Sequence, residues 1–190
     1  MTKLIRIKGL LFLLVCALFS LNGCGGGGGS GSSPSTPTTP VVSNTVALEL
    51  GIPVKSGNMV TFPLNFTNPN GYPISGIEAN IGFDSKAFTV IMNGSNPVSA
   101  TPGGATVLAG KTISQSKSPT QSGVLRLIII DLSGGTKSIS SGVVAQISFS
   151  ILPGAPPGSY TYSLEVIKAT DSTGAAKTLE VINPTISFTL

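Results

Sequence analysis

Residues 142–151 read Gly-Val-Val-Ala-Gln-Ile-Ser-Phe-Ser-Ile, and from Val143 onward their apolar side chains fall on every second position. A β-strand turns successive side chains to opposite faces, so this spacing predicts a strand with one face on a core and one in water. The inward set would be Val143, Ala145, Ile147, Phe149 and Ile151, and the outward set Gln146, Ser148 and Ser150. This stretch therefore favours a half-buried sheet.

Four further stretches repeat the alternation. Their apolar sets are Val60, Phe62, Leu64 and Phe66; Ile77, Ala79, Ile81 and Phe83; Tyr160, Tyr162, Leu164 and Val166; and Ile186, Phe188 and Leu190. Residues 124–130 are more continuously apolar, which is typical of a central strand covered on both faces. Pro63 has no backbone N–H to donate, so we expect its strand at a sheet edge or at a bulge.

Clusters of Gly, Pro, Asn, Asp and Ser separate these stretches, as turns require. They lie at residues 68–71, 93–97, 102–104, 133–135, 153–158 and 171–174. We count about nine strands over residues 45–190 and no amphipathic helix there. One-sided strands in this number pack as two sheets face to face, so we predict an all-β fold, an antiparallel β-sandwich of about nine strands.

The composition excludes several classes of protein. The hydrophobic fraction of 41% argues against wholesale disorder. The formal net charge is +4, but three basic residues precede position 9; without them eight basic residues (11 − 3) face seven acidic ones. This near-neutral balance argues against a nucleic-acid partner. Both cysteines, Cys16 and Cys24, precede the predicted domain, so it has neither a disulfide nor a cysteine-ligated zinc site.

The first 23 residues have the pattern of a secretory signal peptide. Lys3, Arg6 and Lys8 precede about twelve mostly apolar residues, which is too short a run for a spanning helix. The alternative is a short retained anchor helix. Residues 21–24, Leu-Asn-Gly-Cys, resemble the lipobox of bacterial lipoproteins. The resemblance implies cleavage before Cys24 and lipid on its thiol, which would anchor the chain in a membrane. The expected location is the bacterial cell envelope, with the outer membrane favoured in a Gram-negative cell because Gly25 is not Asp.

Residues 24–44 form the predicted tether that follows the lipidated cysteine. Residues 25–40 contain only Gly, Ser, Thr and Pro, without charge or a large apolar side chain. Such a segment cannot bury enough surface to offset the entropy of ordering. We therefore divide the chain into a signal peptide (1–23), a lipidated tether (24–44) and a β-domain (45–190).

The β-domain lacks the side chains on which most active sites depend. It contains no His, Trp or Cys, so the commonest general base, metal ligand and activated nucleophile are absent. Its carboxylates are Glu49, Glu78, Asp84, Asp131, Glu165, Asp171 and Glu180, and none forms a close sequence pair. We predict no catalytic residues, no metal site and no cofactor; separated acids meeting in space as a glycosidase pair remain the alternative.

Two groups of side chains leave alternatives open. Asp84 and residues 171–174, Asp-Ser-Thr-Gly, are interpreted as turn formers, with a calcium site as the alternative. Tyr160 and Tyr162 share one strand face and are the candidate ligand-binding residues, since their rings would stack on a sugar if they were exposed. The other interpretation is that they pack in the core. Tyr72 is an isolated loop aromatic.

Several stretches resemble cohesin domains. Residues 57–66, Gly-Asn-Met-Val-Thr-Phe-Pro-Leu-Asn-Phe, resemble an early cohesin strand pair. Residues 74–84, which end in Phe-Asp before a short strand at 88–90, are similar to the next cohesin segment, and residues 142–151 are similar to the Gly-x-x-Ala-x-Ile-x-Phe strand. Residues 171–174 and the closing strand fit the C-terminal end.

The resemblance covers about residues 46–190. It implies a nine-stranded jelly roll that binds dockerins and is related to bacterial carbohydrate-binding modules. We therefore expect a non-catalytic, lipid-anchored module that binds a dockerin-type or other protein partner. The alternatives are a polysaccharide-binding module, which would want exposed aromatics such as Tyr160 and Tyr162, and a purely structural envelope component.

Overall fold

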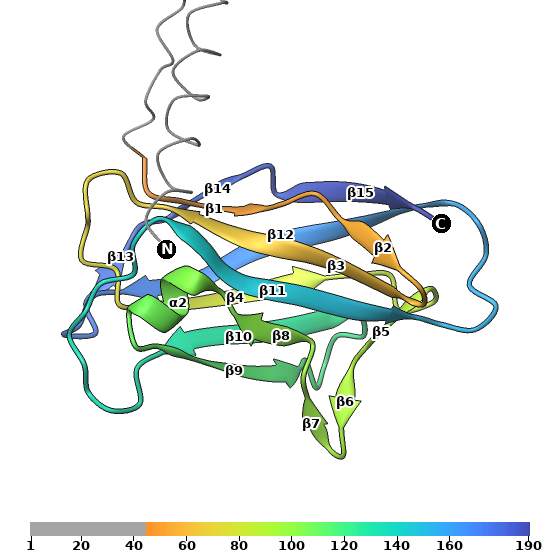
Figure 1. Ribbon diagram of the computed structural model, residues 1–190, viewed down its shortest axis with the longest axis horizontal. Helices are drawn as coiled ribbons and strands as arrows, with labels where there is room; N and C mark the ends of the chain where they lie inside the picture. The colour runs from red at the N-terminus through yellow and green to blue at the C-terminus, as the bar shows by residue number, and fades with distance from the viewer. Residues whose placement is uncertain (1–44) are drawn as a thin grey trace, which may run out of the picture. The chain divides into compact units, whose positions relative to one another are not determined.

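Figure 1 shows the protein as a computed structural model, which describes residues 45–190. These residues belong to one compact unit, and the hydrophobic core, from Val46 to Leu164, lies within them. A unit that contains its own core has what a domain needs to fold by itself. The predictions for the signal peptide, Cys24 and the tether fall outside the described residues. No helix among the described residues is long and apolar enough to cross a membrane.

Sheet A has the strand order β14-β1-β3-β11-β5, with β2 also paired to β3 and β8 also paired to β11. Its strands are β1 (Ala47–Leu50), β2 (Val54–Ser56), β3 (Met59–Thr67), β5 (Phe88–Val90), β8 (Ala100–Pro102), β11 (Gly142–Ile151) and β14 (Glu180–Ile182). All neighbours are antiparallel except β1 and β14, which run parallel.

Sheet B has the order β13-β12-β4-β10-β9, with β15 also paired to β12. Its strands are β4 (Gly76–Gly82), β9 (Thr112–Lys117), β10 (Val124–Ile130), β12 (Ser159–Thr170), β13 (Ala176–Lys177) and β15 (Thr185–Thr189). All of its pairs are antiparallel. A separate hairpin, β6 (Met92–Asn93) and β7 (Asn96–Pro97), extends from the sandwich between β5 and β8 (Figure 1).

The core lies between the two sheets and is built from their inward side chains. Its centre is a cluster of buried rings, in which the Tyr162 ring lies 4.8 Å from Phe62, 5.2 Å from Phe88 and 5.6 Å from Phe149 between centroids. Phe62 and Phe149 come from sheet A and Tyr162 from sheet B, so the cluster joins the layers. The predicted all-β sandwich is confirmed.

The structure has more, shorter strands than the nine expected because several strands are interrupted. β5 and β8 both pair with β11, at Phe149–Ile151 and at Ala145–Ile147, and the β6–β7 hairpin separates them. A five-residue helix, α2 (Gly104–Leu108), follows β8 and was not predicted. It packs on β11, where the Thr106 hydroxyl donates to the Val144 carbonyl at 2.6 Å.

Pro63 was expected at a sheet edge or at a bulge; β3 is not an edge strand, because it lies between β1 and β11, and Pro63 lies at an irregularity of the ladder instead. Leu50 of β1 pairs with Leu64 of β3, and Val54 of β2 pairs with Thr61 of β3. Between these two pairs the chain advances by four residues from β1 to β2 but by only three along β3, so the ladder contains one extra residue. Pro63 lies opposite this irregularity, between β1 and β2. Its carbonyl accepts a hydrogen bond from Gly51 at 2.8 Å, and its missing N–H falls where the ladder is interrupted.

Bulges decide which side chains point inward at two places. On β11 the register with β3 shifts between Val143 and Ala145, and it is Val144 that is buried, not Val143 as the alternation predicts. On β12 the register with β4 shifts between Val166 and Lys168. This second bulge keeps Lys168 outside and turns Ala169 into the core.

Candidate partner-binding face

The prediction that residues 124–130 are covered on both faces is wrong. Leu125, Leu127 and Ile129 are buried, but Arg126 and Ile130 are exposed and Ile128 is half-buried. The outward side chains of β10 and its neighbours form an open surface, which we call the β4–β10 face. It consists of Ser163, Glu165, Ile167 and Lys168 on β12; Gly76, Glu78, Asn80 and Gly82 on β4; Val124, Arg126, Ile128 and Ile130 on β10; and Thr112, Ser114 and Ser116 on β9.

Charged and amide side chains occupy the centre of the β4–β10 face. The Arg126 guanidinium forms an ion pair with Glu78 across β10 and β4, with 2.5 Å between Nη2 and Oε1. The Asn80 amide donates to the Glu165 carboxylate at 3.1 Å. Strand register places Glu165, Asn80 and Arg126 side by side on three adjacent strands. The centre therefore offers a preorganised row of donors and acceptors.

Three isoleucines supply the apolar part of this face. Ile128 lies opposite Glu78, and Ile130 follows it on β10 with 39% of its surface exposed. Ile167 is the extra residue of the β12 bulge, and it is 46% exposed. Exposed aliphatic side chains around hydrogen-bonding groups make the β4–β10 face a candidate protein-binding surface.

The two ends of β4 are glycines, so no side chain projects from the β4–β10 face at these positions. A Cβ atom at Gly82 would lie 2.2 Å from the Ser163 hydroxyl, and one at Gly76 would lie 2.7 Å from the Thr170 hydroxyl. These close approaches explain why glycine occupies both positions. On the far side of β10, the outward side chains of β9 are the short hydroxyl residues Thr112, Ser114 and Ser116.

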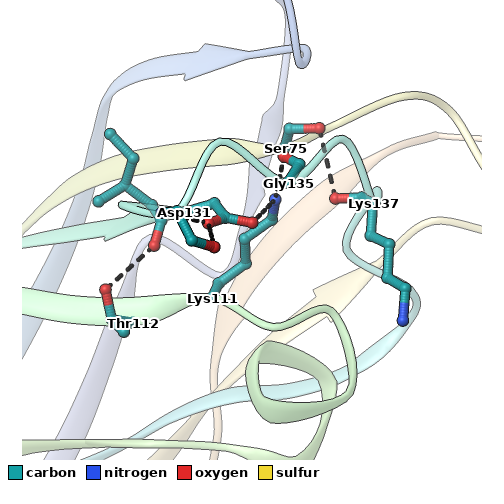
Figure 2. A network of polar contacts seen from close by, with 8 residues as sticks. Ser75, Lys111, Thr112, Asp131, Gly135 and Lys137 are labelled. Atoms are coloured by element: carbon teal, nitrogen blue, oxygen red, sulfur yellow. Dashed lines mark hydrogen bonds and ion pairs between the residues drawn. The ribbon is translucent and has the colours of Figure 1, made fainter.

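A buried ion pair supports one end of the face (Figure 2). Lys111, just before β9, has a fully buried side chain; its ammonium lies 3.4 Å from Asp131, just after β10, and donates to the Gly135 carbonyl at 3.3 Å. Asp131 also accepts bonds from the Ser133 hydroxyl at 2.6 Å and the Ser133 N–H at 2.8 Å. The Ser133 hydroxyl and N–H, with lesser support from Gly135 and Lys111, lower the Asp131 pKa to about 2, so this carboxylate is ionised at neutral pH.

The loop after β12 repeats this chemistry. Asp171 accepts bonds from the Thr173 hydroxyl, at 2.7 Å, and the Thr173 N–H, at 2.9 Å, and it pairs with Lys177 at 2.9 Å. The Thr173 hydroxyl and Lys177 hold the pKa of Asp171 well below its usual range. Asp84 accepts from the Lys86 N–H at 2.8 Å. All three carboxylates thus act as turn acceptors, and residues 45–190 contain no group of three acids, histidines or cysteines that would hold a metal ion.

Tyr160 and Tyr162 both point into the sandwich. Tyr162 is completely buried, burial raises its pKa above the usual value, and its ring has no face free for a sugar. Tyr160 is half-buried, packs edge-on against Phe88 at 5.2 Å and donates its hydroxyl to the Pro156 carbonyl at 2.5 Å. Tyr72 is the one exposed aromatic among the described residues, and it lies in a loop rather than on a strand face.

The cohesin domain family matches residues 51–188, and the match spans both sheets. The chain belongs to the cohesin domain family. No curated protein matches it. Its similarity to cohesins is therefore carried by the family pattern and by solved structures.

Three solved cohesins illustrate the structural likeness. The cohesin of a type I cohesin–dockerin complex from Clostridium thermocellum is 19% identical, with a TM-score of 0.58 over 73% of this chain and 95% of that chain. A cohesin from Clostridium acetobutylicum is 19% identical, with a TM-score of 0.54 over 77% and 90%. A non-cellulosomal cohesin from the archaeon Archaeoglobus fulgidus is 13% identical, with a TM-score of 0.53 over 76% and 90%. At these identities the likeness establishes the fold.

Sequence reasoning did not single out the β4–β10 face of this cohesin. Its candidate residues, Tyr160 and Tyr162, belong to the core, while Arg126, Glu78 and Glu165 meet only through strand pairing. One available signal was Arg126 itself, a charge inside an otherwise apolar strand. A charge at that position must point away from the core, so it marks the outer face.

Proposed function

We propose that this cohesin is a non-catalytic module that binds a protein partner of the dockerin type on the β4–β10 face. The observation that carries the proposal is the combination, on one sheet surface, of the Arg126–Glu78 pair with the exposed Ile130 and Ile167. Such a surface supplies both apolar contact and directional hydrogen bonds. The cohesin–dockerin complexes among the structural relatives support the class of partner.

The surface chemistry argues for a protein rather than a polysaccharide. Carbohydrate recognition by stacking needs exposed rings, and no aromatic side chain lies on an outward strand face within residues 45–190. The carboxylates argue against hydrolysis, since Glu78, Glu165 and Asp131 are already engaged by Arg126, Asn80 and Lys111. The β4–β10 face therefore offers hydrogen-bonding and apolar groups to a partner, and it does not have the free pair of carboxylates that a glycosidase site needs.

A binding screen tests the proposal. Residues 42–190 are titrated by calorimetry with a panel of dockerin modules, and separately with soluble and insoluble polysaccharides and hydrolase substrates. We expect saturable binding to at least one dockerin module. Binding to polysaccharide alone, or turnover of any substrate, would refute the protein-binding assignment.

We also propose that the module is displayed from a membrane of the bacterial cell envelope by lipid on Cys24. The support is the sequence of residues 21–24 and the charge-free Gly/Ser/Thr/Pro segment that follows it. The replacement Cys24→Ser should move the protein from the membrane fraction to the soluble fraction or block its processing. An unmutated, mature protein that is soluble without detergent would contradict the anchor.

A further inference from the structure

The last strand, β15, forms an open edge of sheet B (Figure 1). On one side it pairs with β12, where Leu164 donates to the Pro184 carbonyl at 2.8 Å and Leu190 donates to the Gly158 carbonyl at 3.0 Å. Hydrogen-bonded pairs recur at every second residue of an antiparallel ladder, so Ile186 and Phe188 also bond toward β12. The backbone N–H and C=O groups of Thr185, Ser187 and Thr189 therefore face away from the sheet.

No strand within residues 45–190 covers this edge, because β14 ends at Ile182 in sheet A and the chain crosses to sheet B at Asn183 and Pro184. A groove of about 700 Å³ lies beside the edge, between Thr185–Ser187 on one wall and Gly51–Pro53 on the other. Natural sheets usually protect an open edge with charges, a bulge or an internal proline. β15, Thr-Ile-Ser-Phe-Thr, has none of these.

The sequence of β15 is nearly the same in both directions. In an antiparallel pair of two copies centred on Ser187, Thr185 meets Thr189 of the other copy, and Ile186 meets Phe188. Thr–Thr pairs and pairs of an aromatic with a β-branched side chain are favourable across antiparallel strands. Ile186 and Phe188 are only half-buried against the core, so a second strand would cover them further.

We propose that β15 is a self-association edge, through which a second copy of this chain extends sheet B across a two-fold axis at Ser187. The outward backbone groups of Thr185, Ser187 and Thr189 match those of the second copy, and the absence of charge on the strand removes like-charge repulsion. The two-fold axis is perpendicular to the sheet. If the proposed function holds, both β4–β10 faces then lie on the same side of the dimer and a bivalent partner would engage both.

The test uses opposite charges at Ser187, where two copies meet. Sedimentation of residues 42–190 over about 10 µM to 1 mM should show reversible dimerisation. The replacement Ser187→Lys should raise the dimer dissociation constant at least about tenfold, and so should Ser187→Glu, because like charges then lie directly opposite each other. An equimolar mixture of the two variants should restore association to within about threefold of the unmutated protein.

Thr161→Lys is the matched control, since Thr161 pairs with Ser187 on the same exposed face but one strand in from the edge. It adds the same charge farther from the two-fold axis. The dimer dissociation constant should stay within about threefold of that of the unmutated protein, because salt screens charges separated by more than about 8–10 Å. The proposal is overturned if the unmutated protein is monomeric at about 1 mM, or if Ser187→Lys dimerises as tightly as the unmutated protein. It is also overturned if mixing Ser187→Lys with Ser187→Glu does not restore dimerisation. These readouts need no dockerin, so their failure is separate from failure of the proposed function.

Discussion

The outer surfaces of the two sheets differ in chemistry although their inner surfaces are built alike. The β4–β10 face of sheet B carries four charged side chains, Glu78, Arg126, Glu165 and Lys168, together with three isoleucines. The outward side chains of the two central strands of sheet A, which we call the β3–β11 face, are the uncharged residues Thr61, Pro63, Asn65, Gln146, Ser148 and Ser150. The charged residues of sheet A, Glu49, Lys55 and Glu180, lie on its other strands, β1, β2 and β14. Each sheet buries its other side in the same core. The inner side chains therefore account for the fold, and the outer ones give the centres of the two sheets different surface chemistry.

The largest expected effect is on partner binding. Arg126→Glu places a carboxylate beside Glu78 at the centre of the β4–β10 face, and an arginine at the centre of an interface is a common hot spot. We expect the variant to lose detectable binding to any dockerin module found in the screen, a loss of about 100-fold or more. Isothermal titration calorimetry measures it.

The matched control is Ser148→Glu, which adds the same charge to the β3–β11 face. It should change affinity by less than about threefold. If Ser148→Glu abolishes binding while Arg126→Glu does not, the two faces have been assigned the wrong way round.

The second effect is on stability at the end of the β4–β10 face. Lys111→Met removes a fully buried ammonium and leaves Asp131 without its counter-charge. Breaking a buried pair from one side is strongly destabilising, and we expect Tm to fall by roughly 6–15 °C. Lys55→Met, an exposed position on β2 of sheet A, should change Tm by less than about 2 °C. Equal shifts in the two variants, measured by calorimetry, would show that the Lys111 pair adds nothing.

The third prediction compares one glycine beside each sheet. Gly123, before β10, has φ +77°, and a Cβ atom there would lie 2.3 Å from the Phe83 carbonyl oxygen. Gly57, between β2 and β3, has φ +59° with no atom within 4 Å of an added Cβ. Gly123→Ala should cost roughly 2–4 kcal/mol and Gly57→Ala about 1 kcal/mol, because only the first adds a clash to the backbone strain. Denaturant unfolding that gives the same cost for both would contradict this account.

Much of the fold was predictable because burial imposes a local pattern. Phe62, Phe149 and Leu164 each lie at alternate positions of a run, and each is inward as predicted. The exceptions, Val144 and Ala169, depend on bulges, and a bulge is a property of two paired strands. A single strand's sequence cannot specify where its partner's register shifts.

The site was less predictable because its contacts join residues far apart in the chain. Asn80 and Glu165 are 85 positions apart, and Lys111 and Asp131 are 20 apart. Neither pair stands out by spacing, as residues on one helix would. The Tyr160 and Tyr162 alternation was visible, but it is the pattern of a core strand as well as of a stacking platform, and only burial separates the two.

The smallest effect concerns the β3–β11 face. The Thr61 and Ser148 hydroxyls lie 2.9 Å apart on adjacent strands, in a part-buried pair with no charged partner. Each hydroxyl regains hydrogen bonds to water when the protein unfolds, so the net contribution of the bond is small. A double-mutant cycle of Thr61→Ala and Ser148→Ala should give a coupling free energy of about 0.5–1 kcal/mol, measured by denaturant unfolding. A coupling free energy above about 2 kcal/mol would mean that this hydroxyl pair contributes as much to stability as a buried ion pair such as Lys111–Asp131. A small coupling, together with unchanged partner binding in both single variants, is what a solvated surface requires, and it would leave the β4–β10 face as the one on which charge and apolar contact act together.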